Sequence, residues 1–123
     1  MSIFKLSFGS IIIIQNNLAE VIVNQGVVMD DTLVDEYHKF VLNHLMAPCG
    51  LLVNKKNSYT YTFSAQKRIC NLKEIEHMAV VTQTSGGVMS TQTLLNVSGS
   101  IHKTTKLFED REEALIWLKK KLA

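Results

Sequence analysis

The chain has 123 residues, with 13 lysines and arginines against 11 aspartates and glutamates, so its formal net charge is +2. Hydrophobic residues make up 46% of the chain and charged residues 20%. These values exclude two ordinary domains, intrinsic disorder and a polybasic nucleic-acid binder. We therefore expect residues 1–123 to form one globular domain that does not bind nucleic acid.

Neither the N-terminus nor the rest of the sequence carries a membrane or secretion signal. Met1 to Lys5 is not followed by a long apolar core and a small-residue cleavage site. The longest aliphatic run, Ile11 to Ile14, is far shorter than the roughly 20 residues that span a bilayer. Cys49 and Cys70 form no Cys-x-x-Cys pair, which favours reduced thiols. We expect a soluble, cytoplasmic protein with no transmembrane segment.

The first quarter of the chain has the pattern of short strands. Phe4, Leu6 and Phe8 alternate with polar residues, which places them on one face of a strand. Ile11 to Ile14 is β-branched throughout and is expected to be buried on both faces of a second strand, and residues 18–24 give a third. Turn residues separate these runs, so the pattern predicts an antiparallel meander.

The pattern then changes to a helical period. Apolar residues recur at three- and four-residue spacing from Leu33 to Leu45, after Asp30, and Asp35 is expected to close a capping box. Pro48 and Gly50 are expected to end this helix.

The remaining elements are expected to alternate. Strands are expected at 51–53, 78–82 and 104–108, and helices at 64–70, from Ser85 through Asn96, and from an N-cap at Asp110 to the C-terminus. A meander followed by alternating strands and helices predicts an α/β fold with a mixed sheet and right-handed crossovers.

Four stretches of the sequence resemble the SpoIIAA-like branch of the STAS (sulfate transporter and anti-sigma-factor antagonist) superfamily. They are Val23 to Gly26, Leu52 to Lys55 with Ser58 and Tyr59, Met78 to Val81, and Lys106 to Leu118. The resemblance covers nearly the whole chain and implies a SpoIIAA-like, STAS-like fold. It also implies a regulatory interaction module, because STAS-like proteins typically act in that way.

Some STAS-like proteins change partners when a Ser or Thr is phosphorylated at the start of the helix that follows a central strand. By this resemblance, Ser58 is the nearest hydroxyl here. The switch proteins carry an Asp-Ser-type turn, whereas this chain has Asn54-Lys55-Lys56-Asn57-Ser58-Tyr59. The alternative is a loop serine that caps local backbone. Loops beyond strand ends often carry function, so the candidate functional loop consists of Asn54, Lys55, Ser58 and Tyr59.

No motif in the sequence predicts catalysis or metal binding. His38 and His44 lie about 240° apart around one helix, and His77 and His102 fall in separate elements, so they are not expected to share an ion. The Ser85-Gly86-Gly87 junction lacks a phosphate-loop pattern and is interpreted as a tight helix entry capped by Ser85. We expect no enzyme, no metal and no cofactor.

Charged residues are absent from His77 to His102, a stretch of 26 residues. Interface cores are depleted of charge, so we expect an outer helix face that packs against a second copy, as a homodimer, or against another protein. The alternative is a helix half covered within its own domain. The candidate interface consists of Met89, Ser90, Thr91, Thr93 and Asn96.

Taken together, the sequence predicts a non-enzymatic regulatory module that interacts with a protein partner or with itself. The alternative is a binder of a small apolar molecule or lipid in a pocket between sheet and helices. A pre-formed apolar cavity with a few convergent polar groups would favour this alternative.

Overall fold

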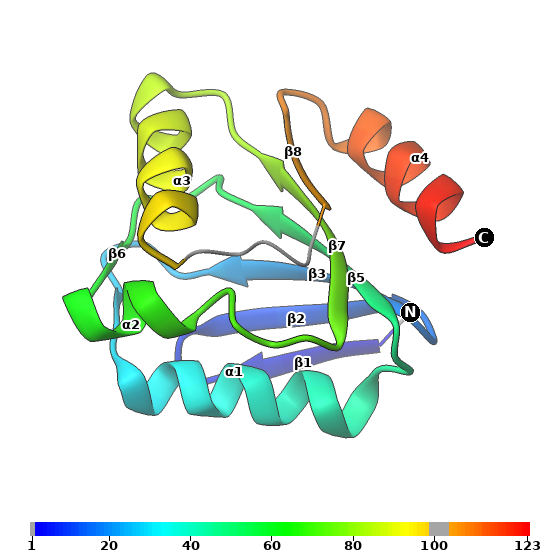
Figure 1. Ribbon diagram of the computed structural model, residues 1–123, viewed down its shortest axis with the longest axis horizontal. Helices are drawn as coiled ribbons and strands as arrows, with labels where there is room; N and C mark the ends of the chain where they lie inside the picture. Colours follow the sequence, from blue (N-terminus) through cyan, green and yellow to red (C-terminus); the bar gives the residue numbers. More distant parts are fainter. Residues whose placement is uncertain (1, 99–103) are drawn as a thin grey trace.

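The computed structural model describes residues 2–98 and 104–123, and its first three strands form a meander (Figure 1). Strands β1 (Ser2–Leu6), β2 (Gly9–Gln15) and β3 (Leu18–Val23) pair antiparallel, as the alternation in the sequence predicts. Strands β5 (Cys49–Asn54), β7 (Ile75–Val81) and β8 (Thr104–Phe108) then add in parallel beside β3. The six-stranded sheet has the order β1-β2-β3-β5-β7-β8, which confirms the predicted mixed α/β architecture.

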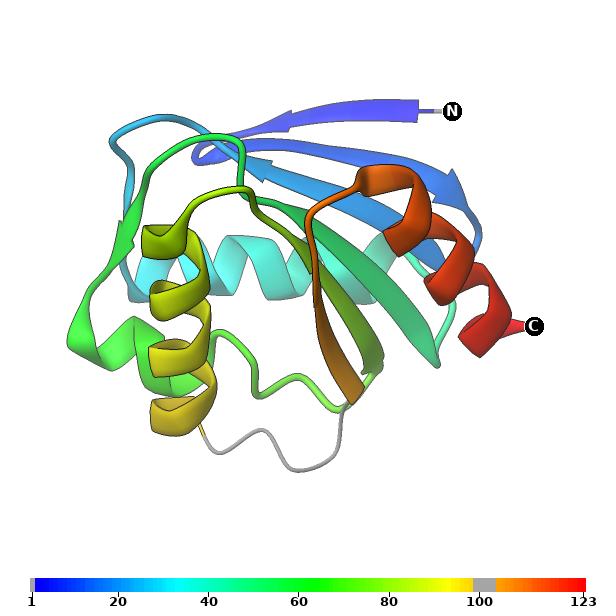
Figure 2. The same ribbon diagram turned by 90° about the horizontal axis from the view of Figure 1, so that it is seen from above.

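Four helices cover this sheet. Helices α1 (Asp31–His44) and α2 (Phe63–Arg68) contribute to one apolar cluster, and α4 (Arg111–Leu122) contributes to a second cluster. Helix α3 (Ser85–Ser98) packs beside α2. Figures 1 and 2 show α3 and α4 on opposite sides of β7 and β8. Within the described residues, α4 covers one face of the sheet, and α1 and α2 cover the other, with α3 next to them.

Side-chain caps fix where the helices begin. The Asp30 carboxylate accepts from the Leu33 amide at 2.9 Å, and Asp110 accepts from the Glu113 amide at 3.3 Å. The predicted capping box at Asp35 is wrong, because that carboxylate pairs with Arg68 of α2 instead. The cap of α3 is also corrected, since the Thr84 hydroxyl, one residue before Ser85, accepts from the Gly87 amide at 2.9 Å.

The end of α1 also differs from the expectation. The helix ends at His44, and the peptide bond before Pro48 is cis. Gly50 lies within β5, so it does not end the helix.

A second sheet, which the sequence pattern did not predict, lies beside the first. It consists of β4 (Val28–Met29) and β6 (Thr60–Tyr61), which pair in parallel. Strands of two residues are too short to show an alternation, so no periodicity marks them. This pair matters for the site because it fixes the segment that carries Tyr59 and Tyr61.

The isoleucine run of β2 is less buried than expected. Only Ile11 is fully buried, while the other three side chains are partly exposed. For Ile12 and Ile14, which alternation places on the α4 face, the reason is that α4 packs on β5, β7 and β8 and covers β2 less. Ile13 lies on the α1 face, where it is only partly buried against the other cluster. The prediction of burial on both faces is therefore wrong for Ile12 to Ile14.

No helix within residues 2–98 and 104–123 combines the length and the hydropathy needed to cross a membrane.

Candidate ligand-binding site

The candidate functional loop begins where β5 ends, and its first two residues point to opposite faces of the sheet. Leu51 and Val53 lie in the cluster beneath α1, whereas Leu52 lies in the cluster beneath α4. Side chains alternate along a strand, so Asn54 falls on the α4 face and Lys55 on the α1 face. The structure therefore separates two residues that the sequence grouped.

Asn54 takes part in a buried ion pair on the α4 face. Its amide donates to Glu20 Oε2 at 2.9 Å, and Arg111 donates to the same carboxylate, with Nη2 to Oε1 at 2.7 Å. Glu20 is only 2% exposed. Burial acts to raise the pKa of Glu20, but the hydrogen bonds from Arg111 and Asn54 outweigh it and lower that pKa. Asn54 thus stabilises the buried carboxylate of Glu20 on the α4 face.

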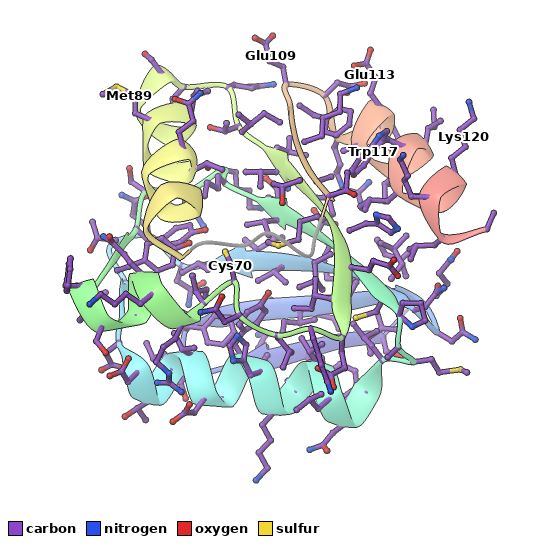
Figure 3. The ribbon with its side chains drawn as sticks, viewed as in Figure 1. Cys70, Met89, Glu109, Glu113, Trp117 and Lys120 are labelled. Atoms are coloured by element: carbon purple, nitrogen blue, oxygen red, sulfur yellow. The ribbon has the colours of Figure 1, made fainter. Side chains whose placement is uncertain are left out.

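On the α1 face, a cavity of about 40 Å³ lies between the sheet and the helices. Its surface is almost wholly apolar, and it draws residues from strands β3, β5, β7 and β8, from α1 and α3, and from segments next to α2. Figure 3 shows Cys70, one of these residues, between α2 and the strands. The lining consists of Phe8, Val21, Val23, Met29, Tyr37, Val53, Lys55, Tyr59, Tyr61, Ile69, Cys70, Met78, Val80, Thr91 and Thr105.

Lys55 is the cationic residue in the cavity wall, and it faces two tyrosines. Its Nζ lies 5.3 Å from the ring centroid of Tyr59 and 5.8 Å from that of Tyr61. Burial lowers the pKa of Lys55 to about 8, with nearby Cys70 acting in the opposite direction. The side-chain amine of Lys55 therefore stays largely protonated at neutral pH, but burial makes its charged form unfavourable in free energy.

The tyrosines around Lys55 are neutral phenols. Burial raises the pKa of Tyr59 to about 12, and it raises the pKa values of Tyr37 and Tyr61 well above their ordinary range. The hydroxyl groups of Tyr59 and Tyr61 lie 3.4 Å apart. The cavity thus offers hydroxyl groups and one ammonium within an apolar surface.

Two threonines add polar atoms to the cavity lining. The Thr91 hydroxyl donates its proton to the Gly87 carbonyl at 2.9 Å, so its donor is used within α3 and only its oxygen lone pairs are left to accept. The Thr105 hydroxyl on β8 is buried and has no hydrogen-bond partner among the described residues. Buried hydroxyl groups normally have a partner, so Thr105 provides a position that a polar atom of a ligand would satisfy.

A second hollow of about 120 Å³ adjoins the cavity and shares Lys55 and Tyr59 with it. We call it the polar groove; it is lined by Lys55, Lys56, Asn57, Ser58, Tyr59, Thr84, Gly86 and Gly87. Its far wall is the first turn of α3. A Cβ atom at Gly87 would lie 2.0 Å from the Thr82 hydroxyl, so glycine is required for α3 to begin this close to β7.

The loop that forms the other wall of the polar groove is held at three points. Asn57 Nδ2 donates to the Val23 carbonyl at 2.9 Å, and the Ser58 amide donates to Gln25 Oε1 at 2.8 Å. The Ser58 carbonyl accepts from the Gly26 amide, also at 2.8 Å. Gly26 adopts a positive φ of 79°, which glycine allows without strain. These bonds orient Lys55, Ser58 and Tyr59 around one opening.

Ser58 does not occupy the position that the STAS resemblance implies for a phosphorylated residue. Helix α2 begins at Phe63 with Thr62 as its N-cap, so β6 separates Ser58 from the helix start. Ser58 is exposed and faces the first turn of α3 across the polar groove. Phosphorylation of Ser58 stays a prediction.

The candidate interface on α3 needs one correction. Met89 is 67% exposed and points away from the sheet in Figure 3, but Thr91 is only 2% exposed and lines the cavity. Thr91 follows Gly87 by one helical turn, so it shares the inner face that approaches β7. The side chains of Ser90, Thr93 and Asn96 lie outside the described part of the structure, so the interface they would form stays a prediction.

The histidines with described side chains make separate local contacts. His38 Nε2 lies 3.0 Å from the Ile69 carbonyl, and His44 Nδ1 lies 3.1 Å from the Phe40 carbonyl. His77 packs against Trp117. Among the described residues, no three His, Cys, Asp or Glu side chains gather as metal ligands, and His102 lies outside them.

Comparisons with known proteins identify the fold alone. No protein-family model matches the chain, and no curated protein matches it. Among solved structures, the chain is similar to an uncharacterized protein of the DUF3478 family with a SpoIIAA-like fold, from Shewanella loihica PV-4. The match has a TM-score of 0.57 and 13% sequence identity, and it covers 95% of this chain and 90% of the other.

Proposed function

We propose that the chain acts as a non-enzymatic regulatory module that binds a small, largely apolar molecule in the cavity on the α1 face. Its SpoIIAA-like fold, which confirms the fold implied by the resemblance in its sequence, supports the regulatory part of this proposal. The cavity carries this proposal, because it has an apolar surface with a few convergent polar groups, as small-molecule sites have. The buried Thr105 hydroxyl, which has no partner within residues 2–98 and 104–123 as far as their side chains are described, supports it.

The size of the cavity limits the ligand. Ligand pockets usually measure about 300–1,000 Å³, and an apolar cavity of about 150 Å³ accommodates benzene. The cavity here, at about 40 Å³, matches only a few non-hydrogen atoms. The ligand therefore has a small apolar part, and any further atoms extend into the polar groove.

Methionine methyl groups provide a direct test. Met29 and Met78 line the cavity, whereas Met46 and Met89 are exposed. We expect titration with 1-butanol, a neutral probe, to shift the methyl NMR signals of Met29 and Met78 while that of Met46 stays fixed. Equal shifts at all methionines, or no saturable shift at millimolar probe, would contradict the proposal.

Two neighbouring valines give a matched control for this titration. Val80 lines the cavity, and Val81 lies in the cluster on the opposite face beneath α4. The Val80→Ile variant adds one methylene to the cavity wall and is expected to weaken binding of 1-butanol severalfold. The Val81→Ile variant makes the same change on the α4 face and is expected to bind as the wild type does.

A second candidate function is self-association through the outer face of α3. The exposure of Met89 favours it, within a segment that contains no lysine, arginine, aspartate or glutamate. Light scattering is expected to give the mass of a dimer for the wild type and of a monomer for Met89→Lys. A wild-type protein that stays monomeric at millimolar concentration would reject this candidate.

A further inference from the structure

Three tyrosines line the cavity on the α1 face. Tyr37 comes from α1, while Tyr59 and Tyr61 come from the segment that the pairing of β6 with β4 fixes. Tyr37 lies close enough to both of the others to interact with them electrostatically. Because burial raises the pKa values of all three phenols, each hydroxyl group keeps a proton that it can donate at neutral pH.

The fold leaves the hydroxyl group of Tyr37 unused. Tyr37 is only 4% exposed, and its hydroxyl has no hydrogen-bond partner within the described part of the chain. A buried hydroxyl normally has a partner, because an unsatisfied donor costs about 1–3 kcal/mol. Since Tyr37 lines the cavity, a polar atom of a bound molecule can accept this proton.

The pair formed by Tyr59 and Tyr61 has a second proton to donate. Their hydroxyl oxygens lie 3.4 Å apart, so one phenol donates to the other. The two hydroxyl groups hold two protons, and this contact uses one of them. Neither hydroxyl makes another hydrogen bond among the described residues. The buried hydroxyl of Thr105, which lines the same cavity, also has no partner among them.

Unused donors in an apolar cavity match a neutral acceptor. A carbonyl oxygen has two lone pairs and brings no proton of its own, so it can accept from Tyr37 and from the Tyr59–Tyr61 pair at once. An alcohol brings a further proton, which would need an acceptor in turn. A carboxylate also accepts, but burying its charge in an apolar surface costs far more free energy than burying a neutral carbonyl group.

We propose that the ligand is a small neutral carbonyl compound, such as a short-chain ketone, whose oxygen accepts hydrogen bonds from Tyr37 and from the Tyr59–Tyr61 pair. This proposal rests on the proposed function, because it assumes that the cavity is the binding site. It adds the chemical class of the ligand and identifies Tyr37 as a residue that determines specificity.

Two probes of the same shape test the role of the ligand oxygen. 2-Butanone carries a carbonyl oxygen where 2-methyl-1-butene carries a methylene group, so the pair isolates the acceptor. The methyl NMR signals of Met29 and Met78, which line the cavity, report both affinities. We expect Tyr37→Phe to weaken binding of 2-butanone about fivefold, which corresponds to about 1 kcal/mol, and to leave binding of 2-methyl-1-butene unchanged.

Tyr61→Phe is the matched control. It removes the same hydroxyl group from the same cavity but leaves Tyr59 with a proton to donate, so it is expected to bind 2-butanone as the wild type does. Circular dichroism establishes that both variants remain folded. Tyr37→Phe is expected to be at least as stable as the wild type, because it removes a buried hydroxyl that has no partner among the described residues.

The carbonyl carbon of the probe gives a measurement that does not depend on a variant. The NMR resonance of a ketone carbonyl carbon moves downfield when the oxygen accepts hydrogen bonds. We expect 2-butanone labelled at this carbon to resonate, when bound to the wild type, well downfield of its position in hexane. A bound resonance at the hexane position would overturn the proposal.

The outcomes separate this proposal from the function on which it rests. Equal effects of Tyr37→Phe on the two probes would overturn the proposal and leave the cavity as a binding site. Tighter binding of 2-butanol or of butanoate than of 2-butanone would also overturn it, because a donor or a charge would then be preferred. Failure of 1-butanol, 2-butanone and 2-methyl-1-butene to bind the folded wild type at all would reject the proposed function itself.

Discussion

Each face of the sheet holds a buried charged side chain, and the two side chains lie in different environments. On the α4 face, the carboxylate of Glu20 receives hydrogen bonds from Arg111 and Asn54 and is fully neutralised within the fold. On the α1 face, the ammonium of Lys55 lies against two aromatic rings at the edge of a cavity. The first charge is paired with an opposite charge inside the fold, whereas the second lies in the wall of a cavity.

This difference separates stability from binding. A closed ion pair with a fixed geometry ties α4 to β3 and leaves nothing for a ligand to satisfy. A cation buried at a cavity wall costs folding free energy, because burial disfavours its charged form. The comparison predicts that charge removal destabilises the protein on the α4 face and stabilises it on the α1 face.

The largest expected effect is on the α4 face. Arg111→Met removes the cation and leaves the Glu20 carboxylate buried without its main partner. We expect the free energy of unfolding to fall by about 3 kcal/mol, toward the lower end of the range for buried pairs because Arg111 is 38% exposed. Urea denaturation at neutral pH measures this change.

Arg68 provides the control for this substitution. It forms ion pairs with Asp31 and Asp35 between α2 and α1, but all three side chains are exposed to solvent. Exposed pairs contribute little to stability, so Arg68→Met is expected to unfold at nearly the wild-type urea concentration. Equal losses in the two variants would mean that burial of Glu20 does not distinguish the α4 face.

The order of the main elements follows from local sequence patterns. The helix after Asp110 has an N-cap, an apolar stripe and basic residues in its last turn, and α4 forms there with the predicted cap. The apolar runs at 51–53 and 78–82 become central parallel strands, because strands buried on both faces need continuous hydrophobicity. Long elements with a clear period are therefore predictable from sequence here.

The site was only partly predictable. The sequence groups Asn54 with Lys55, Ser58 and Tyr59, but strand alternation sends Asn54 to the opposite face, and that alternation was already visible in Leu51 to Lys55. The pairing of Glu20 with Arg111 could not be predicted, because the two residues are 91 positions apart. The cavity likewise depends on Tyr37, Thr91 and Thr105, which the fold brings together from different elements.

The inner face of α3 could have been found from one residue. Gly87 lies so close to Thr82 that an added Cβ atom would clash with its hydroxyl, and Thr91 lies one turn further on the same side. The sequence alone assigns Thr91 to the outer face of α3, because the segment contains no charged residue. Burial against the domain's own sheet explains that lack of charge at Thr91 equally well.

A smaller effect is expected from the pH dependence of stability on the α1 face. The pKa of Lys55 is lowered from 10.5 to about 8 in the folded protein, so the unfolded chain binds more protons between these values. Stability due to Lys55 therefore rises with pH in this window, by about 2 kcal/mol from pH 8 to pH 10. Thermal or urea denaturation at a series of pH values measures this rise, which Lys55→Met is expected to lack.

Other groups near Lys55 also change the stability of the protein with pH. The contribution of Lys55 is therefore obtained by comparing the wild type with variants. Cys70, Tyr59 and Tyr61 are its titratable neighbours, and Lys56 is the adjacent charge. The pKa values of Tyr59 and Tyr61 are raised in the folded protein, so these phenols stay protonated there at a pH at which the unfolded chain loses its phenol protons. The contribution of these two tyrosines to stability therefore falls above about pH 10. Lys55→Met retains this fall, so its difference from the wild type isolates the lysine. If Lys56→Met loses the rise between pH 8 and pH 10 as fully as Lys55→Met does, the cost arises from the general charge of the loop, and the contrast between the two faces fails.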